Sequence, residues 1–204
     1  MSTNRIAVID DQEEVRRALA EMLDAYGYAV TTYHSAEAFL AGPARADYAC
    51  VVSDVRMPGM DGIGLVKALG GAEARPGVIL ISGQADVPMA VAALKAGASD
   101  FIEKPVDDVA LIAAINRTQA RASAPAPSTA PAADELARFS RLTPREAQVF
   151  DLIAEGHTSQ SIARLFDISV RTVESYRAQA MEKLQLTSIA ALVRLAVRLG
   201  RVQA

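Results

Sequence analysis

Three features that many proteins have are scarce or missing in this 204-residue chain. It has a single cysteine, Cys50, and no apolar run close to the ~20 residues that span a bilayer. One cysteine excludes an intramolecular disulfide and suits a reducing compartment. The first residues lead directly into a strand pattern, and no signal-peptide pattern precedes it. We therefore expect a cytoplasmic protein with no membrane partner.

The net charge of −3 hides an unequal distribution along the chain. Residues 138–204 carry 10 Lys and Arg against 6 Asp and Glu, whereas the remainder carries 11 against 18. The C-terminal part is therefore basic and the larger N-terminal part acidic. Such an asymmetry indicates different partners for the two parts, with nucleic acid a candidate for the basic one.

Five apolar, β-branched runs alternate with five segments of helical periodicity in the N-terminal part. This alternation predicts an α/β fold, with a parallel sheet covered by helices on both faces. Right-handed crossovers leave few topologies, and we expect the strand order 2-1-3-4-5. The expected strands are 5–9, 28–33, 50–53, 78–81 and 101–103, and the expected helices are 12–26, 35–40, 63–69, 87–96 and 107–121.

Polar residues stand where four of these strands end, namely Asp10, Asp11, Asp54, Ser82 and Lys104. In a parallel sheet of this order the strand ends meet at one edge, where ligands bind. Each residue alone fits a blander role: a capping Asp or Ser, or a surface lysine. Together they point to a single site.

Three clustered carboxylates repel one another, and Mg²⁺ relieves this with one or two carboxylates plus phosphate oxygens and water. A carboxylate can also act as a nucleophile and form an aspartyl phosphate. In such a phosphoryl transfer Asp54 fits the nucleophile, Asp10 and Asp11 the metal ligands, Lys104 the cation and Ser82 a hydroxyl ligand.

A second domain follows a Pro/Ala/Ser-rich stretch that we expect to be an extended linker. Thr143 and Glu146 have the spacing of a helix capping box. Further on, a short helix at about 160–166, a brief turn and a longer helix from 170 to 184 form a helix-turn-helix pattern. The predicted segments are therefore 1–122, a linker at 123–137, and an all-α domain of four helices at 138–204.

The longer helix of this pattern carries a candidate DNA-binding face. Val173, Tyr176 and Ala180 form a stripe that faces the core, which leaves other side chains more outward. Arginine can reach guanine edges or phosphates, and hydroxyls can contact either. A solvated basic face is the alternative, and the helix-turn-helix context favours DNA. The expected contacts are Arg171, Thr172, Ser175 and Arg177, with Lys183 on the phosphate backbone.

The order Asp10-Asp11, Asp54, Asp61-Gly62, Ser82-Gly83 and Lys104-Pro105 resembles the receiver domain of bacterial response regulators. The resemblance covers residues 1–122 and implies a flavodoxin-like (βα)5 fold. It makes Asp54 the acceptor of a phosphoryl group from a sensor histidine kinase, with Lys104 assisting. It implies Mg²⁺ as cofactor, held by Asp10, Asp11, Asp54 and the Arg56 carbonyl, and a conformational switch made by Ser82 and Phe101.

Residues 142–195 resemble the LuxR/NarL-type DNA-binding domain. The matching runs include Leu142-Thr143-Pro144-Arg145-Glu146 and Arg171-Thr172-Val173-Glu174. Ser159-Gln160 departs from the Asn-Lys pair that is frequent in the family, which puts one phosphate contact in doubt. The pairing of the two domains is most similar to the FixJ-type regulators, although Gln84-Ala85 replaces their frequent His-Gly.

We therefore expect a phosphorylation-controlled transcription factor, and not an enzyme beyond assisting its own phosphorylation and dephosphorylation. Phosphorylation is expected to produce a homodimer through a surface that includes Val91 and Lys95. The dimer would bind a near-palindromic site in double-stranded DNA and activate transcription, with RNA polymerase as a further partner. The alternatives are a phosphorelay or protein-binding module, or a phosphatase with an Asp nucleophile, that does not bind specific DNA.

Overall fold

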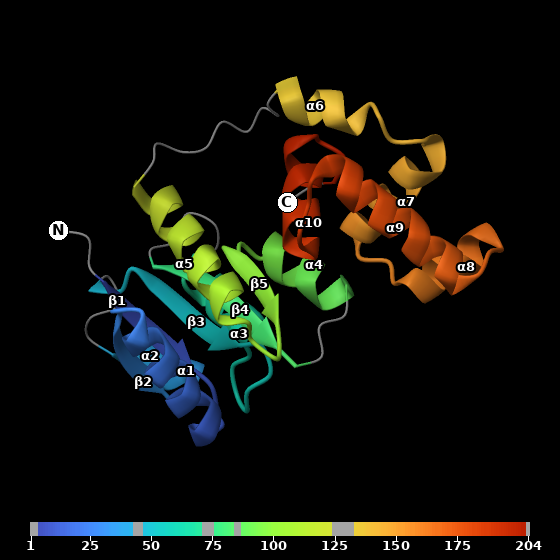
Figure 1. The fold of residues 1–204 in the computed structure, drawn as a ribbon. Helices are drawn as coiled ribbons and strands as arrows, with labels where there is room; N and C mark the ends of the chain where they lie inside the picture. Colours follow the sequence, from blue (N-terminus) through green and yellow to red (C-terminus); the bar gives the residue numbers. More distant parts are fainter. Residues whose placement is uncertain (1–3, 43–46, 71–75, 84–86, 124–132, 203–204) are drawn as a thin grey trace. The chain divides into compact units, whose positions relative to one another are not determined.

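The sheet of the N-terminal part has the predicted topology (Figure 1). The computed structural model describes residues 4–42, 47–70, 76–83, 87–123 and 133–202. Its five strands pair in parallel in the order β2-β1-β3-β4-β5, which confirms the expected flavodoxin-like order. The strands are β1 (Arg5–Ile9), β2 (Ala29–Tyr33), β3 (Cys50–Asp54), β4 (Gly77–Ser82) and β5 (Asp100–Glu103).

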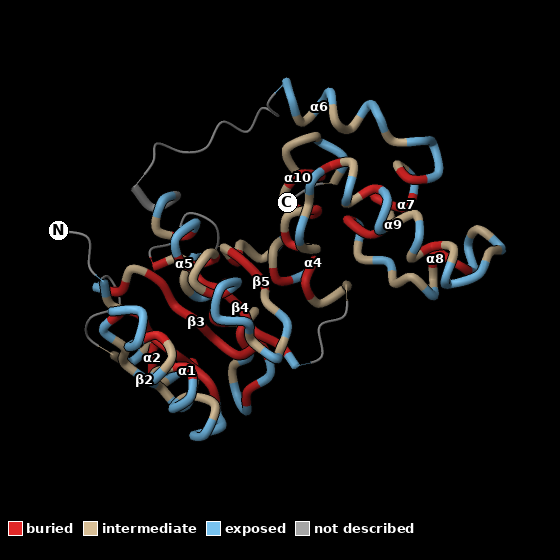
Figure 2. The backbone as a smooth tube through the Cα atoms, viewed as in Figure 1, coloured by how far each residue is buried: buried red, intermediate tan, exposed pale blue. Residues whose placement is uncertain are grey.

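The register of the strands brings their C-terminal ends to one edge. Ile9 of β1 pairs with Ser53 of β3, and Asp54 pairs with Ile81 of β4. All five residues of β3 are buried, as Figure 2 shows along the centre of the sheet. The residue that ends β3, Asp54, is therefore held on a strand that neighbours fix on both sides.

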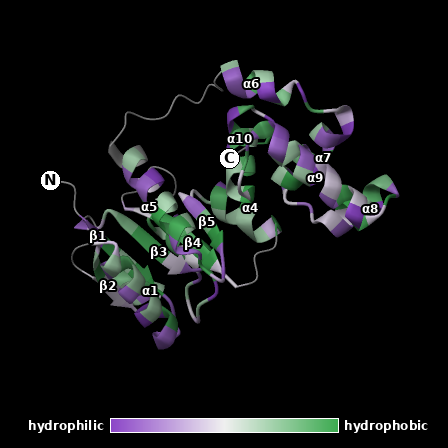
Figure 3. Cartoon of the chain, in the orientation of Figure 1, coloured by the Kyte–Doolittle hydropathy of each residue, from purple (hydrophilic) through white to green (hydrophobic). Residues whose placement is uncertain are grey.

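Helices cover both faces of the sheet. On one face, apolar residues of α1 (Glu13–Ala25) and α5 (Asp108–Ser123), such as Leu23 and Ile115, pack with alternate strand residues such as Val52 and Ile79. Shorter helices, α2 (Ala36–Ala41) and α3 (Gly62–Ala68), contact β2 and β4. The central strands are accordingly the most hydrophobic part of the sheet (Figure 3).

By their contacts, the described elements fall into two units. The sheet, with α1, α2, α3 and α5, forms one unit. The other consists of α4 (Val87–Lys95), α6 (Ala133–Phe139), α7 (Pro144–Glu155), α8 (Ser159–Phe166), α9 (Val170–Leu184) and α10 (Ile189–Arg198). The sequence did not indicate helix α6, and residues 124–132 of the predicted linker lie outside the described residues. Within the described ranges, no helix has the length and apolar character needed to cross a bilayer.

The second unit is built from short helices with well-defined ends. The predicted capping box is present: the Glu146 amide donates to Thr143 Oγ1 at 3.3 Å, and Glu146 Oε2 accepts from the Thr143 amide at 2.7 Å. Ser169 caps α9 by accepting from the Thr172 amide at 3.1 Å. Because α8 ends at Asp167 in the left-handed conformation (φ 53°), α9 begins after a tight turn. The predicted helix-turn-helix is therefore present.

Candidate functional site

A lysine joins two carboxylates at the C-terminal edge of the sheet. Lys104 Nζ lies 2.9 Å from Asp10 Oδ2 and 2.6 Å from Asp54 Oδ1. Asp10 is 1% exposed and Asp54 is 8% exposed, so both charges are largely withdrawn from water. The structure thus brings together three of the predicted site residues, which come from the ends of three different strands.

Backbone amides hold the remaining oxygen of each carboxylate. The Gln12 amide donates to Asp10 Oδ1 at 2.9 Å, and the Arg56 amide donates to Asp54 Oδ2 at 2.6 Å. Hydrogen bonds to the charged form stabilise a buried carboxylate that would otherwise lose hydration. Each carboxylate is therefore oriented by one charged and one backbone donor.

Arg16 is a site residue that sequence reasoning missed. Its Nη1 donates to the main-chain oxygen of Asp10 at 2.7 Å and so ties the end of β1 to the first turns of α1. The spacing of six residues from Asp10 gives no distinctive sequence signal, because outward arginines are ordinary on an amphipathic helix. Only the turn between strand and helix brings the guanidinium back to this carbonyl.

Lys104 is electrostatically matched to its partners. Burial alone would lower the pKa of its ammonium group, but the hydrogen bonds and charges of Asp54 and Asp10 outweigh burial and raise the pKa. The side chain therefore carries a full positive charge at neutral pH. A fixed cation beside a carboxylate is what a transferring phosphoryl group requires.

The other predicted residues of this edge lie nearby in the fold, with different exposure. Asp11 is exposed, whereas Ser82 and Phe101 are buried. The Lys104 amide donates to the Ser82 carbonyl at 2.8 Å, which joins the ends of β4 and β5. The hydroxyl and the lysine of the proposed site are thus carried by neighbouring, hydrogen-bonded chain segments.

The donor chemistry of this edge fits Mg²⁺. Among the described residues no group of three acidic, His or Cys side chains is gathered closely enough to form a complete cage. Mg²⁺ does not need one, because it usually keeps several waters and binds one or two carboxylates together with phosphate oxygens. The buried carboxylates of Asp10 and Asp54 supply hard oxygen donors of that kind.

The loop after Asp54 is held in place by close contacts. A Cβ on Gly62 would lie 2.5 Å from the Asp54 carbonyl oxygen and 2.8 Å from Leu80 Cδ2, so only glycine allows α3 to begin this near β3. Asp61 caps α3 by accepting from the Gly64 amide at 2.6 Å. The loop therefore leaves Asp54 and returns to it within a few residues.

A second feature that the sequence did not reveal is a carboxylate of α2 that bonds to this loop. Glu37 of α2 accepts a hydrogen bond from the Met60 amide at 2.7 Å, across 23 residues of sequence. Hydrogen bonds from main-chain amides, its own first and then that of Met60, lower the pKa of Glu37. Glu37 therefore remains ionised and fastens the loop to α2.

In the second unit, α9 presents a polar outer face. Arg171 and Ser175 are exposed and Thr172 is partly exposed, whereas Val173 and Ala180 are buried as predicted. Gln179 is also exposed and was missed. It lies four residues after Ser175 and seven after Thr172, which places all three on one side of the helix.

Two of the predicted DNA contacts are engaged in ion pairs within this unit. Arg177 Nη1 lies 3.3 Å from Glu174 Oε2, and Glu174 also accepts a hydrogen bond from the hydroxyl of Ser159. Lys183 Nζ donates to both carboxylate oxygens of Glu146. Their contacts with DNA stay predictions, and the structure adds a role for each in holding the helices together.

The two residues predicted at a dimer surface differ in exposure. Val91 is buried in the core cluster of the second unit, and Lys95 is exposed at the end of α4. Their part in dimerisation stays a prediction.

Comparison with protein families identifies both parts of the chain. Residues 6–116 match the response regulator receiver domain, and residues 140–196 match the luxR family of bacterial regulatory proteins. The first match contains the Asp10, Asp54 and Lys104 cluster, and the second contains the helix-turn-helix. These matches define a DNA-binding response regulator of a two-component system, a class of transcription regulators. A module without DNA binding, or a phosphatase, is not favoured.

Individual relatives show which type of response regulator this chain is. The chain is 45% identical over 195 residues to the transcriptional regulatory protein FixJ of Bradyrhizobium diazoefficiens, covering 96% of this chain and 95% of the relative. It is 43% identical to FixJ of Rhizobium meliloti over 98% of both chains. The crystal structure of full-length FixJ from B. japonicum matches over the whole of both chains, at 43% identity and a TM-score of 0.54. The chain belongs to the FixJ-type response regulators.

Proposed function

We propose that Asp54 accepts a phosphoryl group from the phospho-histidine of a sensor histidine kinase. The observation that carries this proposal is the position of Lys104 Nζ between Asp54 Oδ1 and Asp10 Oδ2. The Asp54 carboxylate supplies the nucleophile, and the Lys104 ammonium group neutralises charge on the incoming phosphoryl oxygens. The chain assists its own phosphorylation and dephosphorylation in this way.

Asp10, Asp11, Asp54 and the Arg56 carbonyl would hold Mg²⁺ at this edge of the sheet. When bound, the metal supplies further positive charge for the phosphoryl oxygens. The Gln12 and Arg56 amides each bond one oxygen of these two buried carboxylates and so fix their orientation. Arg16 supports the same geometry through the Asp10 carbonyl.

The phosphorylated site acts on the rest of the chain through Ser82 and Phe101. A phosphoryl group adds charge and acceptor oxygens. The Ser82 hydroxyl moves to bond one of these oxygens, and Phe101 rotates into the space that is vacated. The α4 surface then pairs two copies of the chain through Lys95 and through Val91, which must leave the core cluster in which it is buried.

The paired chains bind a near-palindromic site in double-stranded DNA and activate transcription in the cytoplasm, with RNA polymerase as a partner. Helix α9 enters the major groove with Arg171, Thr172 and Ser175 toward the bases. Gln179 continues the same outer face. Arg177 and Lys183 contribute charge near the phosphates. Two linked copies bind more tightly than one because the second binding event is intramolecular.

The test compares wild type with Asp54→Asn and Asp24→Asn after treatment with acetyl phosphate and Mg²⁺. Asp24 is an exposed residue of α1 and serves as the matched control. Acid-labile phosphate should be present on wild type and Asp24→Asn and absent from Asp54→Asn. Normal labelling of Asp54→Asn would exclude it as the acceptor.

DNA binding is tested with the same phosphorylated full-length chain on a duplex recovered by in vitro selection. Arg171→Ala should lose about 1–3 kcal/mol of discrimination at one base position. Arg141→Ala, an exposed arginine outside α9, should keep the sequence preference. An Arg171→Ala variant with wild-type affinity and preference would refute the role of α9.

A further inference from the structure

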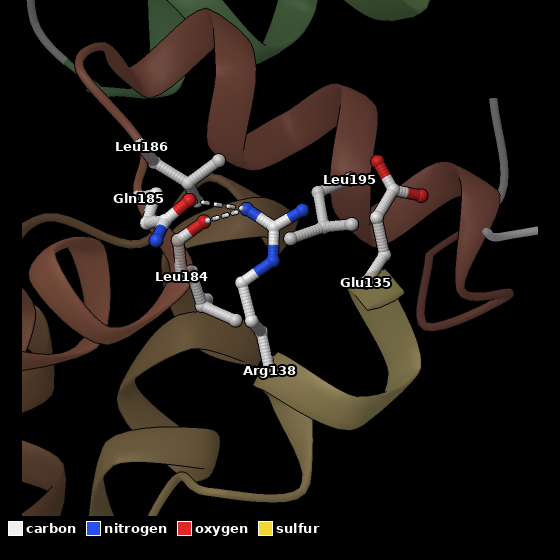
Figure 4. A pocket seen from close by; sticks show the side chains of 6 residues that line it. All are labelled: Glu135, Arg138, Leu184, Gln185, Leu186 and Leu195. Atoms are coloured by element: carbon white, nitrogen blue, oxygen red, sulfur yellow. Dashed lines mark hydrogen bonds between the residues drawn. The ribbon is translucent and has the colours of Figure 1, made fainter. Parts of the chain in front are cut away.

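Helix α6 lies outside the part of the chain that matches the luxR family, which begins at residue 140. Its side chains nevertheless reach both of the last two helices of the DNA-binding unit. Figure 4 shows Arg138 of α6 pointing between the end of α9 and Leu195 of α10. This short helix is therefore more than the end of a linker.

The C-terminal end of α9 has an unusual residue. Gln185 follows the helix in the left-handed conformation (φ 57°), a position that glycine takes more easily. Its amide donates to the Glu182 carbonyl at 3.0 Å, and the Leu186 amide donates to the Met181 carbonyl at 2.8 Å. These two bonds close the helix but do not engage the Leu184 carbonyl.

Arg138 engages that carbonyl. Its Nη1 donates to the Leu184 oxygen at 3.2 Å and to Gln185 Oε1 at 3.1 Å, both drawn as dashed lines in Figure 4. Its Nη2 pairs with Asp134 Oδ2 at 2.7 Å, one turn earlier in α6, which fixes the guanidinium fork. A glycine at 185 would offer no side-chain acceptor. Gln185 therefore provides Arg138 with a hydrogen-bond partner that glycine, the usual residue at such a position, could not.

Helix α6 is fastened at other points too. Glu135 accepts from Arg198 Nε at 3.1 Å and forms an ion pair with the same guanidinium, which lies at the end of α10. Phe139 packs edge-on to Phe150 of α7, with ring centroids 5.3 Å apart. A cavity of about 200 Å³ borders Glu135 and Arg138.

We propose that α6 positions the recognition helix, with Arg138 as the positioning residue for the C-terminal end of α9 and Glu135 for α10. The inference rests on the proposed DNA-reading role of α9. The functional DNA-binding unit of this chain then begins at α6, and the linker acts directly on the helix that reads DNA. Loss of Arg138 lets the end of α9 fray and weakens DNA binding without changing phosphorylation.

The experiment uses the phosphorylated full-length chain and the selected DNA duplex, with affinity measured by fluorescence anisotropy below the unfolding temperature of every variant. Arg138→Ala should weaken binding about fivefold, because a charge-assisted hydrogen bond and a partner for Leu184 are lost. Arg141→Ala removes one equal charge and should change affinity less than twofold, roughly the effect of one exposed charge. Acid-labile phosphate should be equal in all of these variants.

Rescue separates positioning from general stabilisation. Adding Gln185→Gly to Arg138→Ala supplies a residue that ends a helix without help, so affinity should return to within about twofold of wild type. Failure of this rescue, or wild-type affinity of Arg138→Ala, would overturn the proposal. If Arg138→Ala unfolds too readily, Arg138→Lys keeps the charge, cannot serve both acceptors, and should show the same loss and rescue at smaller size.

Arg171→Ala is measured in parallel to keep the two ideas apart. If Arg171→Ala loses sequence preference while Arg138→Ala binds normally, the role of α6 is wrong and that of α9 stands. If Arg171→Ala also binds normally, α9 does not read DNA. The proposed role of α6, which depends on it, is then wrong as well.

Discussion

Lys183 and Glu146 are 37 residues apart in the sequence, yet Lys183 Nζ lies 2.8 and 2.7 Å from the two carboxylate oxygens of Glu146. Glu146 is 2% exposed and also accepts the Thr143 amide. One buried carboxylate therefore completes the cap of α7 and anchors α9. The pair couples the first helix of the family match to the helix proposed to read DNA.

Replacing Lys183 with methionine should lower the free energy of unfolding by about 1–3 kcal/mol, because the buried Glu146 carboxylate loses its charged donor. Urea denaturation of the full chain, followed by far-UV circular dichroism, measures the change. Arg164→Met, an exposed position on α8, is the control and should stay within about 0.5 kcal/mol. Equal effects of the two substitutions would contradict the importance of the pair.

The same pair predicts a pH dependence. Burial would raise the pKa of Glu146, but hydrogen bonds from Lys183 and Thr143 outweigh it and hold the pKa below its ordinary value. The stabilisation is thus full above the unfolded-state pKa of about 4.3 and is lost as the pH falls through the lower folded-state pKa. Glu146→Gln should flatten this part of the stability curve between pH 7 and 3. An unchanged slope in that variant would show that other carboxylates dominate.

Lys104→Ala should slow phosphorylation by acetyl phosphate roughly 100-fold, because a preorganised charged donor beside the nucleophile is removed. The rate of acid-labile phosphate formation in the presence of Mg²⁺ is the measurement. Lys67→Ala, an exposed lysine of α3, should react at the wild-type rate. A Lys104→Ala variant that reacts normally would mean that the ammonium group only neutralises the resting carboxylates.

Glu37→Ala should slow the same reaction about 2- to 5-fold, because the loop that carries the Arg56 carbonyl loses its tie to α2. Glu37→Gln retains an oxygen acceptor for the Met60 amide and should stay near the wild-type rate. Glu21→Ala removes an exposed carboxylate from α1 and controls for charge. Equal rates in Glu37→Ala and Glu37→Gln would show that the hydrogen bond does not position the loop.

Gly62→Ala should destabilise the receiver by about 1–3 kcal/mol, since its Cβ would meet main chain that cannot move without displacing Asp54. Gly83→Ala is the control, because its Cβ would approach only Lys104 Cδ at 3.9 Å. Chemical denaturation of both variants measures the difference. Similar midpoints would indicate that α3 shifts freely from β3.

The sheet was predictable because its signals are local. Apolar runs of strand length, ending on polar residues, mark β1 to β5, and right-handed crossovers leave little choice of order. The helix starts at Ser35, Thr143 and Ser169 were predictable too, since an N-cap bonds an amide two or three residues ahead.

Helix α6 was not predictable by the same means. None of its residues is buried: Phe139 packs against the core only in part and Leu136 is exposed, so its apolar signal is weak. Its anchors, Arg138 to Leu184 and Glu135 to Arg198, join residues 46 and 63 positions apart. Glu37 was missed because its role depends on a distant loop that folds back toward α2. Gln179 was missed because the DNA-binding face was predicted from charged and hydroxyl side chains, and Gln179 is neither.

The central place of β3 has a consequence for amide hydrogen exchange in the receiver. Its amides and carbonyls bond to β1 on one side and β4 on the other, and all five residues are buried. Deuterium should reach these amides last in the receiver, since they open only when the whole sheet does. The residue proposed to carry the phosphoryl group is thus expected to stand on the strand of the sheet that exchanges most slowly.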